Sequence, residues 1–344
     1  MTPVRNKTLL LVTVDTEASM VGLRPLEPEQ MVWGRVGDGT WGIERMMDIC
    51  DAHGVKATFF ISTLEALHYG DDHIRSIAEA VTARGHDPQV HVHPIWLGGK
   101  FAQKSLSAYG LEDQSAAIGQ AVEVFRRLCG SEPLAHRAGG LWCNAATFQA
   151  LAEVGIRLDS SVARGYHPYE LGGEPPNVPR RLAALAEVPV TVFAQLRVGR
   201  WASWRHFDIN ACTLAELRFV VEAAAREGVA ALCLLMHSFS FLRRGKRGQV
   251  VAPAPEEARK FERFLGHVAE RPDVEVLTFH ELAERLGGDP SILEGPDFAP
   301  VSGPWRTYCR SWQRFGTSWK NKAVALAPPA AAAAAAGAIW WLSR

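Results

Sequence analysis

Residues 229–237, with the sequence VAALCLLMH, form an unbroken apolar run that ends on a histidine. A strand that is covered on both faces of a parallel sheet has this pattern, because neither face meets water. The run follows a helical pattern over 213–228, which begins at a typical N-cap residue, Thr213, and stops at Gly228. A helix followed at once by a buried strand predicts an α/β fold built on a parallel sheet.

The same alternation of strand and helix patterns extends over most of the chain. Strand patterns are found at 8–15, 55–61, 86–96 (HDPQVHVHPIW), 134–137, 156–160, 187–194, 229–237 and 274–279. Helical patterns are found at 40–54 (from an N-cap at Thr40), 71–85, 112–130, 144–155, 213–228, 255–270 and 280–286. This alternation predicts a distorted (β/α) barrel of about seven parallel strands. We place it in one domain over residues 1–290.

The composition excludes several classes of protein. Lys+Arg and Asp+Glu balance at 37 each in a chain of 344 residues, so we expect no nucleic-acid partner. The six cysteines are scattered without a C-x-x-C pair, which argues against a disulfide scaffold and fits a reducing compartment. The first apolar run, TLLLVTVD at 8–15, is too short for a signal peptide. We therefore expect a cytoplasmic protein.

Ionisable residues stand at the carboxyl ends of five of the expected strands. They are Asp15 with Glu17, His91 with His93, Arg137, Asp159 and His237. The carboxyl ends of barrel strands converge on one rim, where active sites lie. Because alternate residues of a strand point to the same side, His91 and His93 are expected to project together. The pair alone is compatible with two partly exposed histidines near a turn, but the set on five strands favours a metal site.

These residue types suit metal-assisted hydrolysis. Zn²⁺ favours histidines with a carboxylate and leaves one position for a water molecule, whose pKa it lowers. A second carboxylate can accept the proton of that water, and a histidine across the site can protonate a leaving amine. An arginine beside the base keeps it ionised.

Five short motifs carry these residues. In chain order they are VTVDTE (12–17), GHDPQVHVHP (85–94), HRAGG (136–140), LDSS (158–161) and LLMHS (234–238). Each is weak alone, but together and in this order they resemble the motifs of the polysaccharide deacetylases (NodB-homology domain, carbohydrate esterase family 4). The resemblance implies a hydrolase that removes an N-acetyl group, with O-acetyl less favoured, from a glycan or glycoconjugate.

The resemblance also implies catalytic roles. Asp15 is expected to be the base, with Arg137 orienting it. His237 is expected to be the general acid, with Asp159 tuning it. His136, the neighbour of Arg137, points the other way along its strand and is expected to serve in packing or at the surface.

A divalent metal, expected to be Zn²⁺, is implied with Glu17 and His91 as ligands. The sequence departs from the family pattern at the carboxylate ligand and at the second histidine ligand. The usual second carboxylate directly follows the first, but here Thr16 stands in that place. The usual second histidine lies four residues after the first, but Ile95 stands there and His93 is the nearby alternative. The H-x-H spacing requires both histidines to lie on extended backbone.

The substrate surface is expected to include the glycine pair of the HRAGG motif and aromatic residues of the rim. These are Gly139, Gly140, Trp96 and Trp142, with Trp201 and Trp204 as further candidates for stacking on sugar rings. His86, at the entry of its strand, is expected to be structural and to hydrogen-bond the backbone. Two alternatives stay open: hydrolysis of another C–N bond, such as that of a cyclic amide, and a non-catalytic glycan-binding barrel.

Asp297 is the last acidic residue, and all charged side chains after it are basic. We divide the remainder into a basic and aromatic linker at 291–322 and an Ala-rich low-complexity tail at 323–344. Residues 323–342 lack charge over a length that could just span a bilayer, but the Ala content and Pro328 argue against a spanning helix. A disordered tail and contact with the anionic cytoplasmic face of a membrane both stay open.

Overall fold

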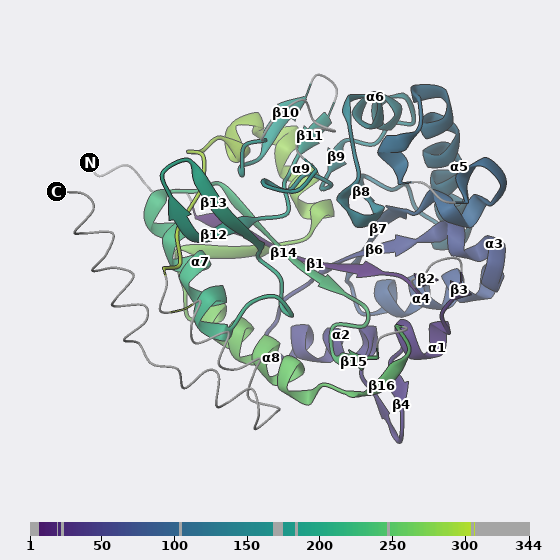
Figure 1. Cartoon of the computed structure of the whole chain (residues 1–344), viewed down its shortest axis with the longest axis horizontal. Helices are drawn as coiled ribbons and strands as arrows, with labels where there is room; N and C mark the ends of the chain where they lie inside the picture. Colours follow the sequence, from purple (N-terminus) through teal and green to yellow (C-terminus); the bar gives the residue numbers. More distant parts are fainter. Residues whose placement is uncertain are drawn as a thin grey trace.

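Nine strands form one curled sheet in the part of the chain that the computed structural model describes (Figure 1). The described residues are 7–18, 20–21, 24–102, 105–167, 175–182, 185–245, 248–303 and 306. The strand order is β10-β11-β9-β8-β7-β6-β1-β14, with β17 also paired to β1. The strands are β1 (Thr8–Thr16), β6 (Thr58–Ser62), β7 (Asp87–Val92), β8 (Ala135–Ala138), β9 (Leu158–Asp159), β10 (Arg180–Leu182), β11 (Leu185–Glu187), β14 (Ala231–His237) and β17 (Val274–Leu277).

All neighbouring strands in this sheet run parallel except β10 and β11. Because the order has two ends, β10 and β14, the sheet is a curled half-barrel and not a closed ring. The expected α/β fold with a distorted barrel of mainly parallel strands is confirmed.

Helices cover the sheet (Figure 1). They are α2 (Ile43–Ala52), α4 (Asp71–Ala83), α5 (Leu111–Cys129), α6 (Ala145–Glu153), α7 (Leu214–Glu227), α8 (Pro255–Ala269) and α9 (Phe279–Gly288), with the single turns α1 (Pro28–Met31) and α3 (Ala66–Tyr69). Their apolar faces are buried; on α4, for example, Ile74, Ile77, Ala78 and Val81 recur at helical spacing and are buried. The capping box of Thr213 and the left-handed C-cap of Gly228 delimit α7 as the sequence predicted.

Four short hairpins lie outside the main sheet in the described residues. They are β2 (Met20–Val21) with β3 (Arg24–Pro25), β4 (Arg35–Val36) with β5 (Gly39–Thr40), β12 (Val192–Val198) with β13 (Trp201–His206), and β15 (Leu242–Arg244) with β16 (Val250–Pro253). The N-cap predicted at Thr40 is wrong. Thr40 pairs with Arg35 in the β4–β5 hairpin, and α2 begins at Ile43 after Gly42.

The strand predicted over 187–194 is two strands. β11 ends at Glu187 in the sheet, and β12 begins at Val192 in a separate hairpin. Pro189 lies between them, and it cannot donate a ladder hydrogen bond. The break lets the chain leave the sheet near the rim.

β1 runs through the middle of the sheet, and all nine of its residues are buried. Its partners are β14 on one side and β6 and β17 on the other. The register pairs Asp15 with His237, so the expected base and the expected acid end adjacent strands. Both strands have a continuous apolar pattern that ends in a polar residue, and their register brings these two polar residues together at the rim.

No helix among the described residues has the length and apolar character to cross a bilayer. The Ala-rich tail and nearly all of the basic linker beyond residue 303 lie outside the described residues.

Candidate active site

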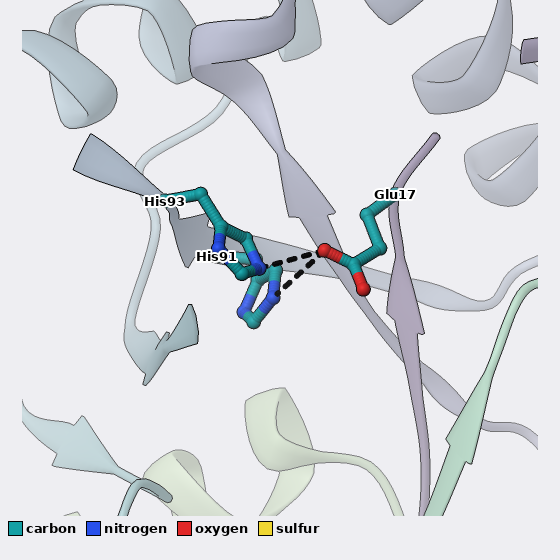
Figure 2. A group of neighbouring side chains, drawn as sticks. All are labelled: Glu17, His91 and His93. Atoms are coloured by element: carbon teal, nitrogen blue, oxygen red, sulfur yellow. Dashed lines mark ion pairs between the residues drawn. The ribbon is translucent and has the colours of Figure 1, made fainter. Parts of the chain in front are cut away.

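Glu17, His91 and His93 come together where β1 and β7 end (Figure 2). Oε2 of Glu17 lies 2.6 Å from Nε2 of His93 and 3.8 Å from Nε2 of His91. The three potential ligand atoms all lie within 4.8 Å of one another. Two imidazoles and one carboxylate are a donor set typical of a catalytic zinc site, so the residues present fit a divalent cation.

His91 is held in the orientation that a ligand needs. Its Nδ1 donates a 2.9 Å hydrogen bond to the carbonyl oxygen of Arg137, which can only accept. The lone pair is therefore on Nε2, which faces Glu17. Burial lowers the pKa of His91 to about 4, so the ring is neutral near pH 7.

His93 follows directly after β7 on extended backbone, with φ −110° and ψ 101°. Its ring centroid lies 4.7 Å from that of His91, so the H-x-H spacing does bring the two rings together. Gly139 forms the floor beneath the His93 ring, because a Cβ at position 139 would lie 2.3 Å from Nδ1 of His93. Burial favours neutral His93, but the carboxylate of Glu17 outweighs it and raises the pKa of His93.

Glu17 lies one residue beyond the end of β1, and its backbone is fixed from two sides. Ser238 Oγ donates to the carbonyl oxygen of Glu17 at 3.0 Å. Both oxygens of Glu65 accept from the backbone N–H of Ala18, at 2.9 and 3.1 Å, and His73 Nε2 lies 3.0 Å from Glu65. These contacts fix the position of the Glu17 carboxylate, although Thr16 separates Glu17 from Asp15 in the motif. Burial opposes its ionisation, but His93 holds the pKa of Glu17 well below its usual range.

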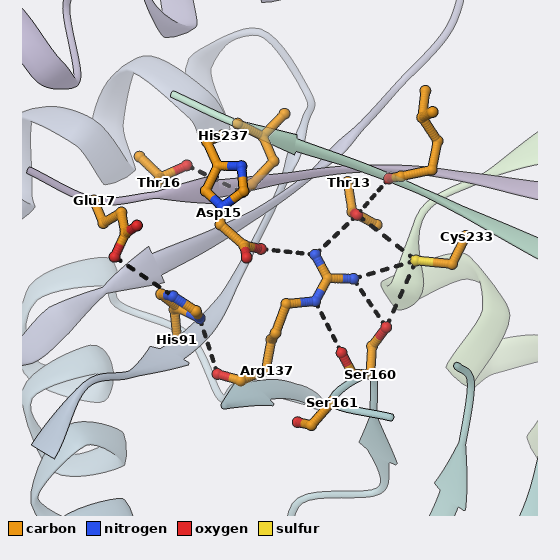
Figure 3. Close-up of polar contacts among 12 residues, drawn as sticks. Thr13, Asp15, Thr16, Glu17, His91, Arg137, Ser160, Ser161, Cys233 and His237 are labelled. Atoms are coloured by element: carbon orange, nitrogen blue, oxygen red, sulfur yellow. Dashed lines mark hydrogen bonds and ion pairs between the residues drawn. The ribbon is translucent and has the colours of Figure 1, made fainter. Parts of the chain in front are cut away.

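Asp15 and Arg137 form a buried ion pair, with Oδ1 of Asp15 2.7 Å from Nη1 of Arg137 (Figure 3). The rest of the guanidinium is fixed by the hydroxyl of Thr13, the carbonyl and hydroxyl oxygens of Ser160 and the sulfur of Cys233. Burial alone would raise the pKa of Asp15, but Arg137 and the nearby histidines lower it below its usual value. The arrangement keeps Asp15 ionised, as a general base requires.

His237 lies at the end of β14, beside Asp15 (Figure 3). Its ring stacks on Phe239, with a centroid distance of 5.0 Å and an interplanar angle of 24°. Its backbone N–H donates to Ser240 Oγ at 2.9 Å. The imidazole thus reaches the same rim as Asp15 and Glu17 and influences the ionisation of both carboxylates.

Asp159 does not take the position next to His237 that we expected. Its Oδ1 lies 2.7 Å from Nδ1 of His136, and Ser161 donates to it through both its backbone N–H and its hydroxyl group. The neighbouring Ser160 points instead to Arg137 in the site. Because alternate residues face opposite sides of a strand, Asp159 faces away from the site. His136 is fully buried with Asp159, so it serves in packing and not at the surface.

Asp208, which no sequence motif indicates, is a buried carboxylate and a candidate partner of His237 in place of Asp159. It pairs with Leu235 in a parallel bridge. Leu235 and His237 are two residues apart on β14, so Asp208 and His237 lie on the same face. Burial raises the pKa of Asp208, and His237 opposes that shift, which places the two groups within electrostatic reach. Asn210 Nδ2 also donates to the carbonyl oxygen of Ser240 at 2.7 Å, tying the two turns together.

The expected aromatic residues have different environments. Trp96 is buried, with 8% of its surface exposed, and packs against Tyr69 in the core, which does not favour contact with a sugar. Trp142 is partly exposed and stacks on His167, whose Nε2 lies 3.2 Å from the carbonyl oxygen of Gly140. Of the two, Trp142 is therefore the one that remains available at the surface.

The β12–β13 hairpin, which the sequence did not predict, carries the other two candidate tryptophans. Trp204 packs beside the guanidinium of Arg164, while Trp201 is 60% exposed. His206 stacks on Tyr166 with a centroid distance of 3.7 Å. Burial, with added repulsion from His237, lowers the pKa of His206 to about 4, so its ring is neutral near pH 7.

His86 takes no part in the candidate active site, as expected. Its Nδ1 accepts a hydrogen bond from the backbone N–H of Ala57 at 3.1 Å, between β6 and the entry of β7. The prediction of a structural role for His86 is confirmed.

No protein-family model and no curated protein matches the chain. Solved structures do share its fold. A protein from Mycobacterium smegmatis described as a polysaccharide deacetylase has a TM-score of 0.56 at 21% identity, and the alignment covers 84% of this chain and 93% of that one. One from Pseudomonas aeruginosa PAO1 with the same description has a TM-score of 0.52 at 14% identity, over 83% and 93% of the two chains.

Puue Allantoinase is similar to the same degree, with a TM-score of 0.53 at 12% identity over 83% of this chain and 92% of that one. At such identities the likeness concerns the fold, so functional assignments depend on the site itself. The chain has the fold of the polysaccharide deacetylases, as its five motifs led us to expect.

Proposed function

We propose that this chain is a metal-dependent hydrolase that removes an N-acetyl group from a glycan or glycoconjugate. One observation carries the proposal. The ion pair of Asp15 with Arg137, the cluster of Glu17 with two histidines, and His237 meet where β1, β7, β8 and β14 of the same parallel sheet end. A binding protein would need neither a buried ionised base nor an acid beside it.

Glu17, His91 and His93 are the residues that would hold the cation, for which we favour Zn²⁺. When bound, such a cation acts as a Lewis acid that lowers the pKa of a water molecule and polarises a carbonyl oxygen. Glu17 supplies a carboxylate that its neighbours keep ionised, and His91 supplies a neutral imidazole.

Asp15 accepts the proton of the attacking water, because Arg137 keeps its carboxylate ionised and fixed. His237, on the adjacent strand, donates a proton to the departing amine. Deep burial of Asp15 and Arg137 lowers the local dielectric, which strengthens their interaction and limits rotation of the base.

The test measures acetate released from N-acetylhexosamine oligomers by the purified chain, with and without a chelator. We expect release that stops on chelation and returns with Zn²⁺. His91→Ala and His93→Ala are expected to lose most bound metal as well. Full occupancy in His93→Ala would remove that residue from the ligand set.

Hydrolysis of a cyclic amide is the competing activity, because Puue Allantoinase shares the fold. The same preparation is offered a cyclic amide in parallel. Ring opening without acetate release would replace the deacetylase proposal, whereas metal and glycan binding without either reaction would support a binding barrel.

We further propose a cytoplasmic location with the C-terminal tail at the membrane surface. Support comes from the basic and aromatic composition after Asp297 alone. Cells expressing the full chain or a version ending at residue 300 are fractionated, and membranes are washed with high salt. We expect salt to release only the full chain from membranes, and both versions free of membranes at low salt would refute the contact.

A further inference from the structure

Arg244 lies in the β15–β16 hairpin, which follows the turn after His237. Its guanidinium carbon lies 4.0 Å from the ring centroid of Phe239. The Phe239 ring in turn stacks on His237 at 5.0 Å. A cation is therefore held one aromatic ring away from the group that we assign as the general acid.

The neighbouring Arg243 is also exposed, but it has a partner within the chain. Arg243 Nε and Nη2 both bond to the same oxygen of Glu256, at 3.2 and 2.9 Å. For Arg244, in contrast, the described part of the chain provides no carboxylate within ion-pair distance. Two adjacent arginines thus face different surroundings, and only Arg244 is turned toward the site.

The charge of Arg244 is not compensated once the site is loaded. The Arg244 side chain is exposed to solvent apart from its contact with Phe239, and Glu17 is a carboxylate whose charge acts on it. Glu17 is already committed to the histidines and, in the proposed function, to a divalent cation. Because the guanidinium is exposed and has no ion-pair partner among the described residues, its N–H donors are available to an oxyanion from outside the chain.

We propose that Arg244 binds an oxyanion of the substrate, on the side of the leaving amine. The planar guanidinium fork matches a phosphate or a carboxylate and leaves the Phe239 face covered. The preferred substrate class is therefore an anionic N-acetyl sugar, carrying either a phosphate ester or a carboxylate, which is favoured over a neutral sugar. This inference rests on the proposed function for its placement of the leaving amine.

The experiment compares N-acetylglucosamine 1-phosphate, N-acetylmuramic acid and neutral N-acetylglucosamine as substrates of the zinc-loaded chain. Three proteins are used: the wild type, Arg244→Gln and Arg243→Gln. We expect kcat/KM of the wild type to favour an anionic sugar over the neutral one by about tenfold or more, the size of one charge-assisted interaction. Which anionic sugar gains identifies the oxyanion.

Arg244→Gln is expected to remove that preference, mainly through a higher KM for the anionic sugar, while Arg243→Gln keeps it. Equal loss in both variants, or no preference in the wild type, would overturn the inference and leave the deacetylase proposal intact. Calorimetric binding of N-acetylglucosamine 1-phosphate to the same three proteins separates the two proposals. Loss of binding in Arg244→Gln alone, without acetate release by any protein, would support the anion site and reject the deacetylase.

Discussion

Gly139 and His93 are in direct contact, and no side chain fits between them. A Cβ built on Gly139 would lie 2.3 Å from Nδ1, 2.4 Å from Cε1 and 2.7 Å from Cγ of the His93 ring. The requirement for glycine is therefore steric and concerns the position of a candidate ligand. The role differs from the substrate contact that the motif had suggested for Gly139.

Gly139→Ala is expected to displace the His93 imidazole and weaken Zn²⁺ binding by about 10- to 100-fold, the usual effect of disturbing the support of a ligand. Calorimetric titration of the metal-free protein with Zn²⁺ measures the change. Gly119→Ala is the control, since its Cβ would meet only Val154, at an ordinary 3.9 Å. An unchanged dissociation constant in Gly139→Ala would mean that His93 contributes little to the site.

Glu65→Gln tests the brace behind Glu17. The substitution removes one of the two carboxylate oxygens that accept from Ala18 N–H, so Glu17 is expected to lose its fixed position and Zn²⁺ affinity to fall by about tenfold. Glu216→Gln is a matched control, because Glu216 is another buried carboxylate that accepts a backbone N–H, in the capping box of α7. Both variants are expected to lower Tm, but only Glu65→Gln to weaken metal binding. Equal metal affinities would assign Glu65 to stability alone.

Asp208→Asn and Asp159→Asn compare two buried carboxylates as partners of His237. Removing a negative charge near an imidazolium makes it release its proton more readily, so the high-pH limb of the kcat/KM profile is expected to move to lower pH in Asp208→Asn. Asp159→Asn is expected to leave that limb in place, because Asp159 is bonded to His136. A shift in Asp159→Asn alone would restore the role that the motif resemblance implied.

Most of the main sheet could be predicted from the sequence because its strands are buried on both faces. The continuous apolar runs of β1 and β14 have no helical period, and helices delimited by residues such as Thr213 and Gly228 separate the strands. The β2–β3 and β4–β5 hairpins were missed because their strands have two residues each, too few to show an alternating pattern. Pro189 could have revealed the break between β11 and β12.

The ligand cluster and the Asp15–Arg137 pair could be predicted because their residues stand at the carboxyl ends of β1, β7 and β8, and a parallel sheet brings such ends to one rim. Glu65 and Asp208 could not, because each lies in a connection whose path depends on tertiary packing. The observed position of Asp159 has a simple origin. A motif gives the order of residues, whereas the face of the strand is decided by its register, and Ser160 takes the inward position here.

His86→Asn is expected to reduce the acid sensitivity of the fold. Burial lowers the pKa of His86 to about 4, below the value of about 6.5 expected in the unfolded chain. The unfolded state therefore binds the extra proton between these values, so stability from this group is present above pH 6.5 and is lost as the pH falls toward 4. Each such proton changes the unfolding free energy by about 1.4 kcal/mol per pH unit.

Asparagine retains an acceptor for the Ala57 N–H but cannot be protonated in this range. Urea unfolding of both proteins between pH 7 and pH 4 measures the slope. A variant with the same slope as the wild type would show that His86 is protonated equally in both states.

The central claim, that Asp15 is a base beside a separate set of metal ligands, is tested most directly by Asp15→Asn. Bound zinc and the rate of acetate release are measured on the same zinc-loaded sample. We predict unchanged zinc content and a rate at least about 100-fold below that of the wild type, the usual size of a general-base contribution. Loss of zinc together with activity, or retention of both, would contradict the account.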